Sequence, residues 1–149
     1  MSEEVFKISI PSDNDGFITF QCPFCRDRFK LTVTDFERED IIEIFCPYCG
    51  LRHENSNFLT DEVIEQANII AENYAKSIIN KWTKDLERSF RNNKHIKFKA
   101  NKPLKMDAEK ILFEKEELET YNLKCCQVTV KTRPIHQVIG VYCPCCGVR

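Results

Sequence analysis

The stretches Cys22-Pro23-Phe24-Cys25 and Cys46-Pro47-Tyr48-Cys49-Gly50 decide the fold of the first part of this chain. Each contains a Cys-x-x-Cys turn, and twenty residues separate the two turns. A turn of this kind directs both sulfurs to one ion, and two of them supply the four thiolates of a tetrahedral Zn²⁺ site. The spacing therefore predicts a structural zinc site formed by Cys22, Cys25, Cys46 and Cys49. Four thiolates close the coordination sphere, so we expect no catalytic water on this ion.

The residues around these turns have the pattern of short strands. Residues 17–20 precede the first turn, residues 29–33 alternate apolar with polar side chains after it, and residues 41–45 lead into the second turn. Their period of two and their β-branched and aromatic content predict three strands.

The C-terminal end of the chain repeats the second turn. Cys143-Pro144-Cys145-Cys146-Gly147 matches residues 46–50, with Cys145 in the place of Tyr48. Aligning Cys126 with Cys25 places residues 130–131 on residues 29–30. We expect a second zinc site, whose ligands are Cys125, Cys126, Cys143 and Cys146. Adjacent cysteines give a tight geometry, so His136 or Cys145 remains an alternative to one of these ligands.

The paired turns resemble the zinc-ribbon superfamily, specifically its transcription-factor type. The resemblance covers residues 15–52, and residues 120–149 resemble a degenerate second ribbon. Arg26 departs from the family pattern, because a glycine is common at that position. Such ribbons occur in transcription factors, polymerase subunits, ribosomal proteins and many bacterial proteins. The resemblance implies a fold and two zinc ions, and it favours DNA binding or transcription by analogy of fold alone.

The composition indicates a folded protein that binds metal through reduced thiols. The chain has 149 residues, nine cysteines and a formal net charge of −1. No run approaches the ~20 apolar residues of a membrane span. The stretch Met1-Ser2-Glu3-Glu4 lacks the basic and apolar regions of a signal peptide. We therefore expect a cytoplasmic protein with no membrane contact, in which metal binding is favoured over disulfides.

A long amphipathic helix is predicted over residues 60–92, which contain no proline or glycine. Apolar residues recur there every three to four positions, at Val63, Ala67, Ile70, Tyr74, Ile78, Trp82 and Leu86. About thirty residues correspond to roughly 45 Å of helix, which is longer than a small ribbon can cover. The apolar face must therefore pack within the monomer or form a homodimer or another protein contact.

A basic segment follows this helix. Residues 81–105 contain nine Lys or Arg and two acids, a local balance of +7, so the rest of the chain totals −8. Ile96 and Phe98 alternate with Lys97 and Lys99, which predicts a short basic strand. A basic surface with an aromatic between lysines is typical of nucleic-acid contact. The candidate contacts are Lys81, Lys84, Arg88, Arg91, Lys94, Lys97 and Lys99. Solvated lysines, or acidic residues 35–43 and 107–119 lying across the patch, would explain the same pattern without a ligand.

Together these features predict an α+β chain of two zinc-ribbon lobes. Each lobe is expected to be three-stranded and antiparallel, and one long helix and the basic strand join them. The expected domains are residues 1–58, residues 59–119 with the helix, basic strand and an acidic connector, and residues 120–149. Within the connector we expect a loop or short helix around residues 111–113, and a strand over residues 118–123 leads into the second ribbon.

The sequence contains no motif of an enzyme. Neither a glycine-rich phosphate loop nor a His-Glu-x-x-His motif is present. We expect a non-enzymatic protein without a small-molecule substrate, acting as a nucleic-acid-associated or regulatory binding module. The alternatives are a protein adaptor or small subunit of a larger complex, and a thiol-based redox or metal sensor at the crowded second site.

Overall fold

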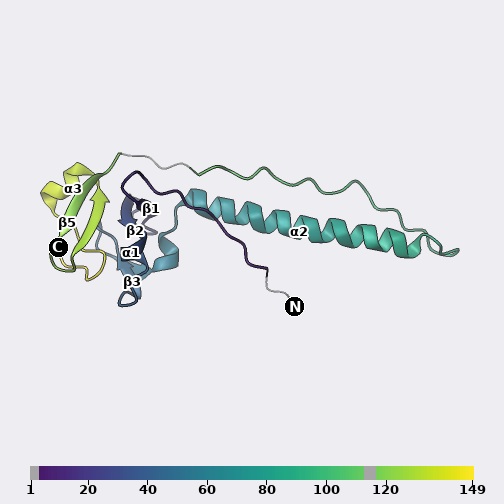
Figure 1. Ribbon diagram of the computed structural model, residues 1–149, viewed down its shortest axis with the longest axis horizontal. Helices are drawn as coiled ribbons and strands as arrows, with labels where there is room; N and C mark the ends of the chain where they lie inside the picture. Colours follow the sequence, from purple (N-terminus) through teal and green to yellow (C-terminus); the bar gives the residue numbers. More distant parts are fainter. Residues whose placement is uncertain (1–3, 113–116) are drawn as a thin grey trace. The chain divides into compact units, whose positions relative to one another are not determined.

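The computed structural model describes residues 4–112 and 117–149, which divide into two compact units. The β unit comprises the described residues 9–64, 112 and 117–149 and contains the described strands. The arm comprises the described residues 4–8 and 65–111 and contains most of α2 (Asp61–Phe90; Figure 1). Of the short helix expected around residues 111–113, residues 111 and 112 are not helical and residue 113 lies outside the described residues.

Two hairpins from opposite ends of the chain form one sheet. β1 (Phe17–Gln21) pairs with β2 (Arg28–Thr32), and β5 (Glu119–Leu123) pairs with β6 (Val128–Thr132). β2 also pairs antiparallel with β6, which gives the order β1-β2-β6-β5 (Figure 1). The prediction of two separate lobes is therefore wrong. A lone two-stranded hairpin is marginally stable in water, and joining the two hairpins covers an edge of each.

The Cys46–Cys49 and Cys143–Cys146 turns do not complete three-stranded ribbons either. β3 (Glu43–Phe45) pairs with β4 (Arg52–Glu54) in a separate two-stranded sheet, and residues 139–142 carry no strand. Instead each turn bonds to the other. The Phe45 N–H donates to the Pro144 carbonyl at 2.9 Å, and the Tyr142 N–H donates to the Pro47 carbonyl at 3.0 Å. The third strand predicted for the first ribbon is present as β3, but it pairs with β4 instead of joining the first hairpin. The N-terminal half of the β unit (residues 9–64) and its C-terminal half (residues 117–149) meet through the reciprocal contact.

The two halves are related by an approximate twofold axis. Lys30 of β2 lies directly opposite Lys131 of β6. Lys131 is also the residue that corresponds to Lys30 when Cys126 is aligned with Cys25, as a twofold axis between the two strands requires. The glycine contacts are reciprocal as well. A Cβ on Gly50 would lie 3.1 Å from the Tyr142 ring, and one on Gly147 would lie 2.6 Å from the Phe45 ring. The halves therefore pack as two subunits of a symmetric dimer do, with the same surfaces in contact on both sides.

The core of the β unit draws its apolar side chains from both halves. They are Phe20, Phe29, Leu31, Ile44, Phe58, Val128, Val130 and Val141, packed around the buried cysteines. Short helices follow three of the strands: α1 (Val33–Phe36) follows β2, η1 (Asn55–Phe58) follows β4 and α3 (Pro134–Ile139) follows β6. Phe58 at the end of η1 packs edge-on against Phe29, with ring centroids 5.9 Å apart. Among the described residues of the β unit, the buried apolar side chains of both halves belong to one cluster.

The long helix has the bounds that its periodicity predicts to within two residues. The Thr60 hydroxyl accepts a hydrogen bond from the Val63 N–H and so caps the start of α2. The first turn is also held by charge, because Asp61 and Glu62 pair with Arg26 and Arg28 of the first hairpin. Acidic residues at this position complement the positive end of the helix dipole.

The predicted basic strand is not present: residues 93–111 form an extended strap that runs back along α2 (Figure 1). A ladder of side-chain amides holds the strap, with Gln66, Asn73 and Asn80 bonding to its backbone at residues 110, 107 and 104. Asn73 and Asn80 each donate to a strap carbonyl and accept from the N–H of the same residue, at 2.8–3.0 Å. Seven helical residues rise ~10.5 Å, and three extended residues span ~9–10 Å, so the two repeats stay in register.

Candidate metal centres

The structure brings the four cysteines of the first pair of turns into one group. Their sulfurs all lie within 4.8 Å of one another. The Sγ atoms of Cys22 and Cys49 are 3.7 Å apart, and so are those of Cys25 and Cys46. A tetrahedron with Zn–S bonds of ~2.3 Å has edges of ~3.8 Å, whereas a disulfide would need ~2.05 Å. The spacing fits four thiolates around one metal ion.

Three of the turns share one backbone geometry. The N–H of the residue four positions after the first cysteine donates to that cysteine's carbonyl, from Arg26, Gly50 and Gly147 at 2.8–3.0 Å. All three donors have positive φ, between 65° and 73°. Arg26 thus adopts the conformation that favours glycine, in the place where the resemblance expects one. Gln127, which follows Cys126 as Arg26 follows Cys25, also has positive φ, at 53°.

The second group consists of Cys125, Cys126, Cys143 and Cys146, whose sulfurs also lie within 4.8 Å of one another. The Sγ atoms of Cys125 and Cys146 are 3.7 Å apart. Adjacent cysteines therefore reach one site. Arg38 of the first half supports this turn, because its guanidinium donates to the Cys126 carbonyl at 3.1 Å.

The alternative ligands lie elsewhere. Cys145 packs against the hydrophobic core, and burial raises its pKa to about 12. The His136 ring packs edge-on against Tyr48, with centroids 4.4 Å apart. Among the described residues, neither Cys145 nor His136 belongs to a group that could hold a metal ion.

The two groups differ in exposure. Cys22 and Cys46 are buried in the first group, whereas Cys125 and Cys146 are exposed in the second. Burial raises the pKa of Cys25 to about 11 and raises that of Cys46 as well. Four clustered thiolates repel one another, so a bound cation is required to hold them deprotonated.

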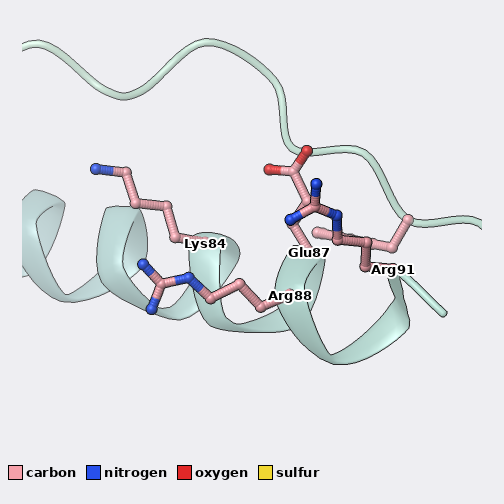
Figure 2. Close-up of a pocket in the computed structure, with 5 residues that line it drawn as sticks. Lys84, Glu87, Arg88 and Arg91 are labelled. Carbon is pink, nitrogen blue, oxygen red and sulfur yellow. The ribbon is translucent and has the colours of Figure 1, made fainter.

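The basic residues predicted to contact nucleic acid are only partly gathered. Lys84, Arg88 and Arg91 line an open hollow of about 370 Å³ on the arm, together with Glu87 and Phe98 (Figure 2). Phe98 belongs to the strap and lies against Phe90 at the end of α2, with ring centroids 6.4 Å apart. The other candidates, Lys81, Lys94, Lys97 and Lys99, are exposed and do not line the hollow.

Two groups of residues important to this arrangement were not predicted. The amide ladder has a sequence signal, since Gln66, Asn73 and Asn80 are spaced seven apart. No sequence signal marks Asp13, yet its buried carboxylate accepts hydrogen bonds from the Lys30 and Lys131 ammonium groups where the two hairpins meet.

No protein-family model, curated protein or solved structure matches this chain. The assignment of its sites therefore depends on geometry and chemistry alone. Among the residues that the structure describes, no helix has both the length and the apolar character needed to cross a membrane.

Proposed function

We propose that the chain is a non-enzymatic zinc protein whose two ions are structural, and that its arm binds single-stranded nucleic acid. Zinc is favoured because thiolate sulfurs at tetrahedral spacing are its preferred donors in closed structural sites. The free energy of metal binding would go into folding the β unit.

The observation that carries the nucleic-acid proposal is the hollow on the arm. Lys84 and Arg88 lie one turn apart on α2, and Arg91 follows its end (Figure 2). Glu87 also lines the opening, so three cations and one acid leave it a local charge of +2, and the cations supply bonds to phosphate oxygens. Phe98 adds an aromatic wall, on which an unpaired base can stack. A single strand presents both groups together, whereas a duplex hides the faces of its bases.

The acidic residues of the strap do not neutralise this hollow. Asp107 pairs with Lys76, and Glu109 lies beside Gln66, so both are near the first half of α2. Lys94, Lys97 and Lys99 lie in the first part of the strap, which follows the end of α2, so they are at the same end of the arm as the hollow. Residues 81–105 carry a balance of +7, although the whole chain is near neutral. Binding is thus expected to be local to this end of the arm.

Fluorescence anisotropy with labelled single-stranded DNA, RNA and duplex DNA tests the proposal. The zinc-loaded chain should prefer a single strand, and its affinity should fall with salt. Arg88→Glu should weaken binding about 10-fold and lower the salt slope by about 1. Arg52→Glu is the matched control, because Arg52 is also an exposed arginine near one acid and the charge change is equal.

Two results would count against the hollow. Equal losses in both variants would mean that only net charge matters. Retention of full affinity by Arg88→Glu would remove the hollow from the binding surface. Circular dichroism and zinc content of each variant establish that it is folded.

A further inference from the structure

The face of α2 that is turned away from the strap carries an exposed apolar stripe. The stripe consists of Ala71, Ala75, Ile78, Ile79 and Trp82, with the polar Asn68 at its proximal end, and all six are exposed. Trp82, the largest member of the stripe, is 62% exposed. Asn68, Ala75 and Trp82 each follow a ladder residue by two positions, which is ~200° around the helix. The strap therefore leaves this stripe uncovered within the arm.

The stripe is bulky in one half and small in the other. Ile78, Ile79 and Trp82 follow Ala75, whereas Ala71 and Asn68 precede it. Two copies that pair antiparallel around Ala75 would set Ile79 level with Ala71, Trp82 level with Asn68 and Ile78 level with Glu72, so each bulky side chain lies beside a small or polar one. Such a pairing is self-complementary, as a twofold interface requires. A parallel pairing would instead set Trp82 against Trp82 and alanine against alanine.

The charge along the arm favours the same orientation. Only the charges on α2 itself lie near this face, because the strap is on the opposite side. The distal part of the helix, residues 81–90, contains three basic and two acidic residues, a balance of +1. The proximal part, residues 65–80, contains one basic and two acidic residues, a balance of −1. Antiparallel copies place these opposite charges side by side, whereas parallel copies place like charges together.

We infer that the occupant of this stripe is a second copy of the chain, paired antiparallel through α2. Shape and charge are separate observations, and each selects this orientation. The interface lies on the opposite side of α2 from the strap and does not depend on nucleic-acid binding.

Molar mass and tryptophan fluorescence test the self-association directly. Trp82 is the only tryptophan, so its emission should shift to shorter wavelength as concentration rises and the dimer forms. Light scattering of the zinc-loaded full chain should show a rise above 17.5 kDa over the same range. Trp82→Arg should weaken the dimer at least 10-fold. Val138→Arg is the control, because Val138 is exposed on α3 of the β unit and should leave the dimer unchanged.

A residue exchange tests the orientation. Ala71→Ile should weaken an antiparallel dimer, and adding Ile79→Ala should restore it, because the exchange moves the bulky side chain to the other side of the same contact. In a parallel pair residue 71 meets residue 71, so the double variant would not be rescued. A chain that stays monomeric to about 1 mM overturns the inference. A dimer without rescue overturns the antiparallel arrangement.

Discussion

Asp13 stabilises the contact between the two hairpins, and replacing it by asparagine is the most direct test of the fold. Its carboxylate is fully buried and lies 2.7 Å from the Lys131 ammonium and 3.3 Å from the Lys30 ammonium. These lysines are cross-strand neighbours on β2 and β6. Like charges directly opposite each other destabilise a sheet, so the buried carboxylate is needed to balance them.

The expected loss follows from the pKa of Asp13. Burial opposes ionisation, but hydrogen bonds from Lys131 and from the Phe17 and Asp15 N–H groups lower the pKa from 3.8 to about 2. A difference of this size corresponds to ~2.5 kcal/mol, and breaking a buried ion pair costs about 3–5 kcal/mol. We expect Asp13→Asn to lower the free energy of unfolding by about 3 kcal/mol. Because the folded pKa is depressed, this stabilisation is complete above pH ~4 and is lost as pH falls toward 2.

Urea unfolding of the zinc-loaded chain at pH 7, followed by circular dichroism, measures this loss. Asp15→Asn is the matched control. Its carboxylate also bonds to Lys131, but 67% of the side chain is exposed, so the loss should be below about 1 kcal/mol. Equal losses in the two variants, or less than about 1 kcal/mol for Asp13→Asn, would refute the assignment of Asp13 as a buried charge partner.

Three further predictions concern the metal centres and the strap. Cys46→Ser should lower bound zinc from two ions per chain toward one, whereas Cys145→Ser should leave two, as measured by elemental analysis; loss of zinc in the second variant would make Cys145 a ligand. A chromogenic chelator should remove the second ion faster than the first, because Cys125 is exposed and Cys46 is buried; one uniform rate would contradict this. Asn80→Ala should speed backbone amide hydrogen exchange in residues 102–106 about 10-fold, because it removes two hydrogen bonds to Leu104. The control Asn68→Ala should leave this exchange unchanged. Equal exchange rates in the two variants would exclude the ladder.

Local sequence signals predicted the elements and the cysteine groups well. The spacing of turns predicted which four cysteines lie together at each group, because a short turn fixes the positions of its own two sulfurs. Periodicity predicted β1, β2 and α2 with small errors at their ends. These features depend on residues close to one another in sequence.

The pairing of β2 with β6 was not predictable in the same way. About one hundred residues separate Lys30 from Lys131, and alternation within a strand does not name its partner. The repeat of residues 46–50 at residues 143–147 suggested two copies of a motif, but not that the copies would share a sheet. The strap was missed for another reason. Its contact with α2 is selected by polar amides, whereas part of the apolar pattern, at Ile78 and Trp82, remains exposed.

The shared sheet makes the two metal centres parts of one folding unit. Core residues such as Phe29 and Val130 come from different halves, and reciprocal hydrogen bonds join the turns at Pro47 and Pro144. Metal binding in such a small unit is also folding free energy, so filling one centre should order the strands that position the other. We therefore expect zinc to bind the metal-free chain with positive cooperativity, seen in a calorimetric titration. Two separate lobes would bind two ions independently, and independent binding would contradict the argument that the shared core couples them.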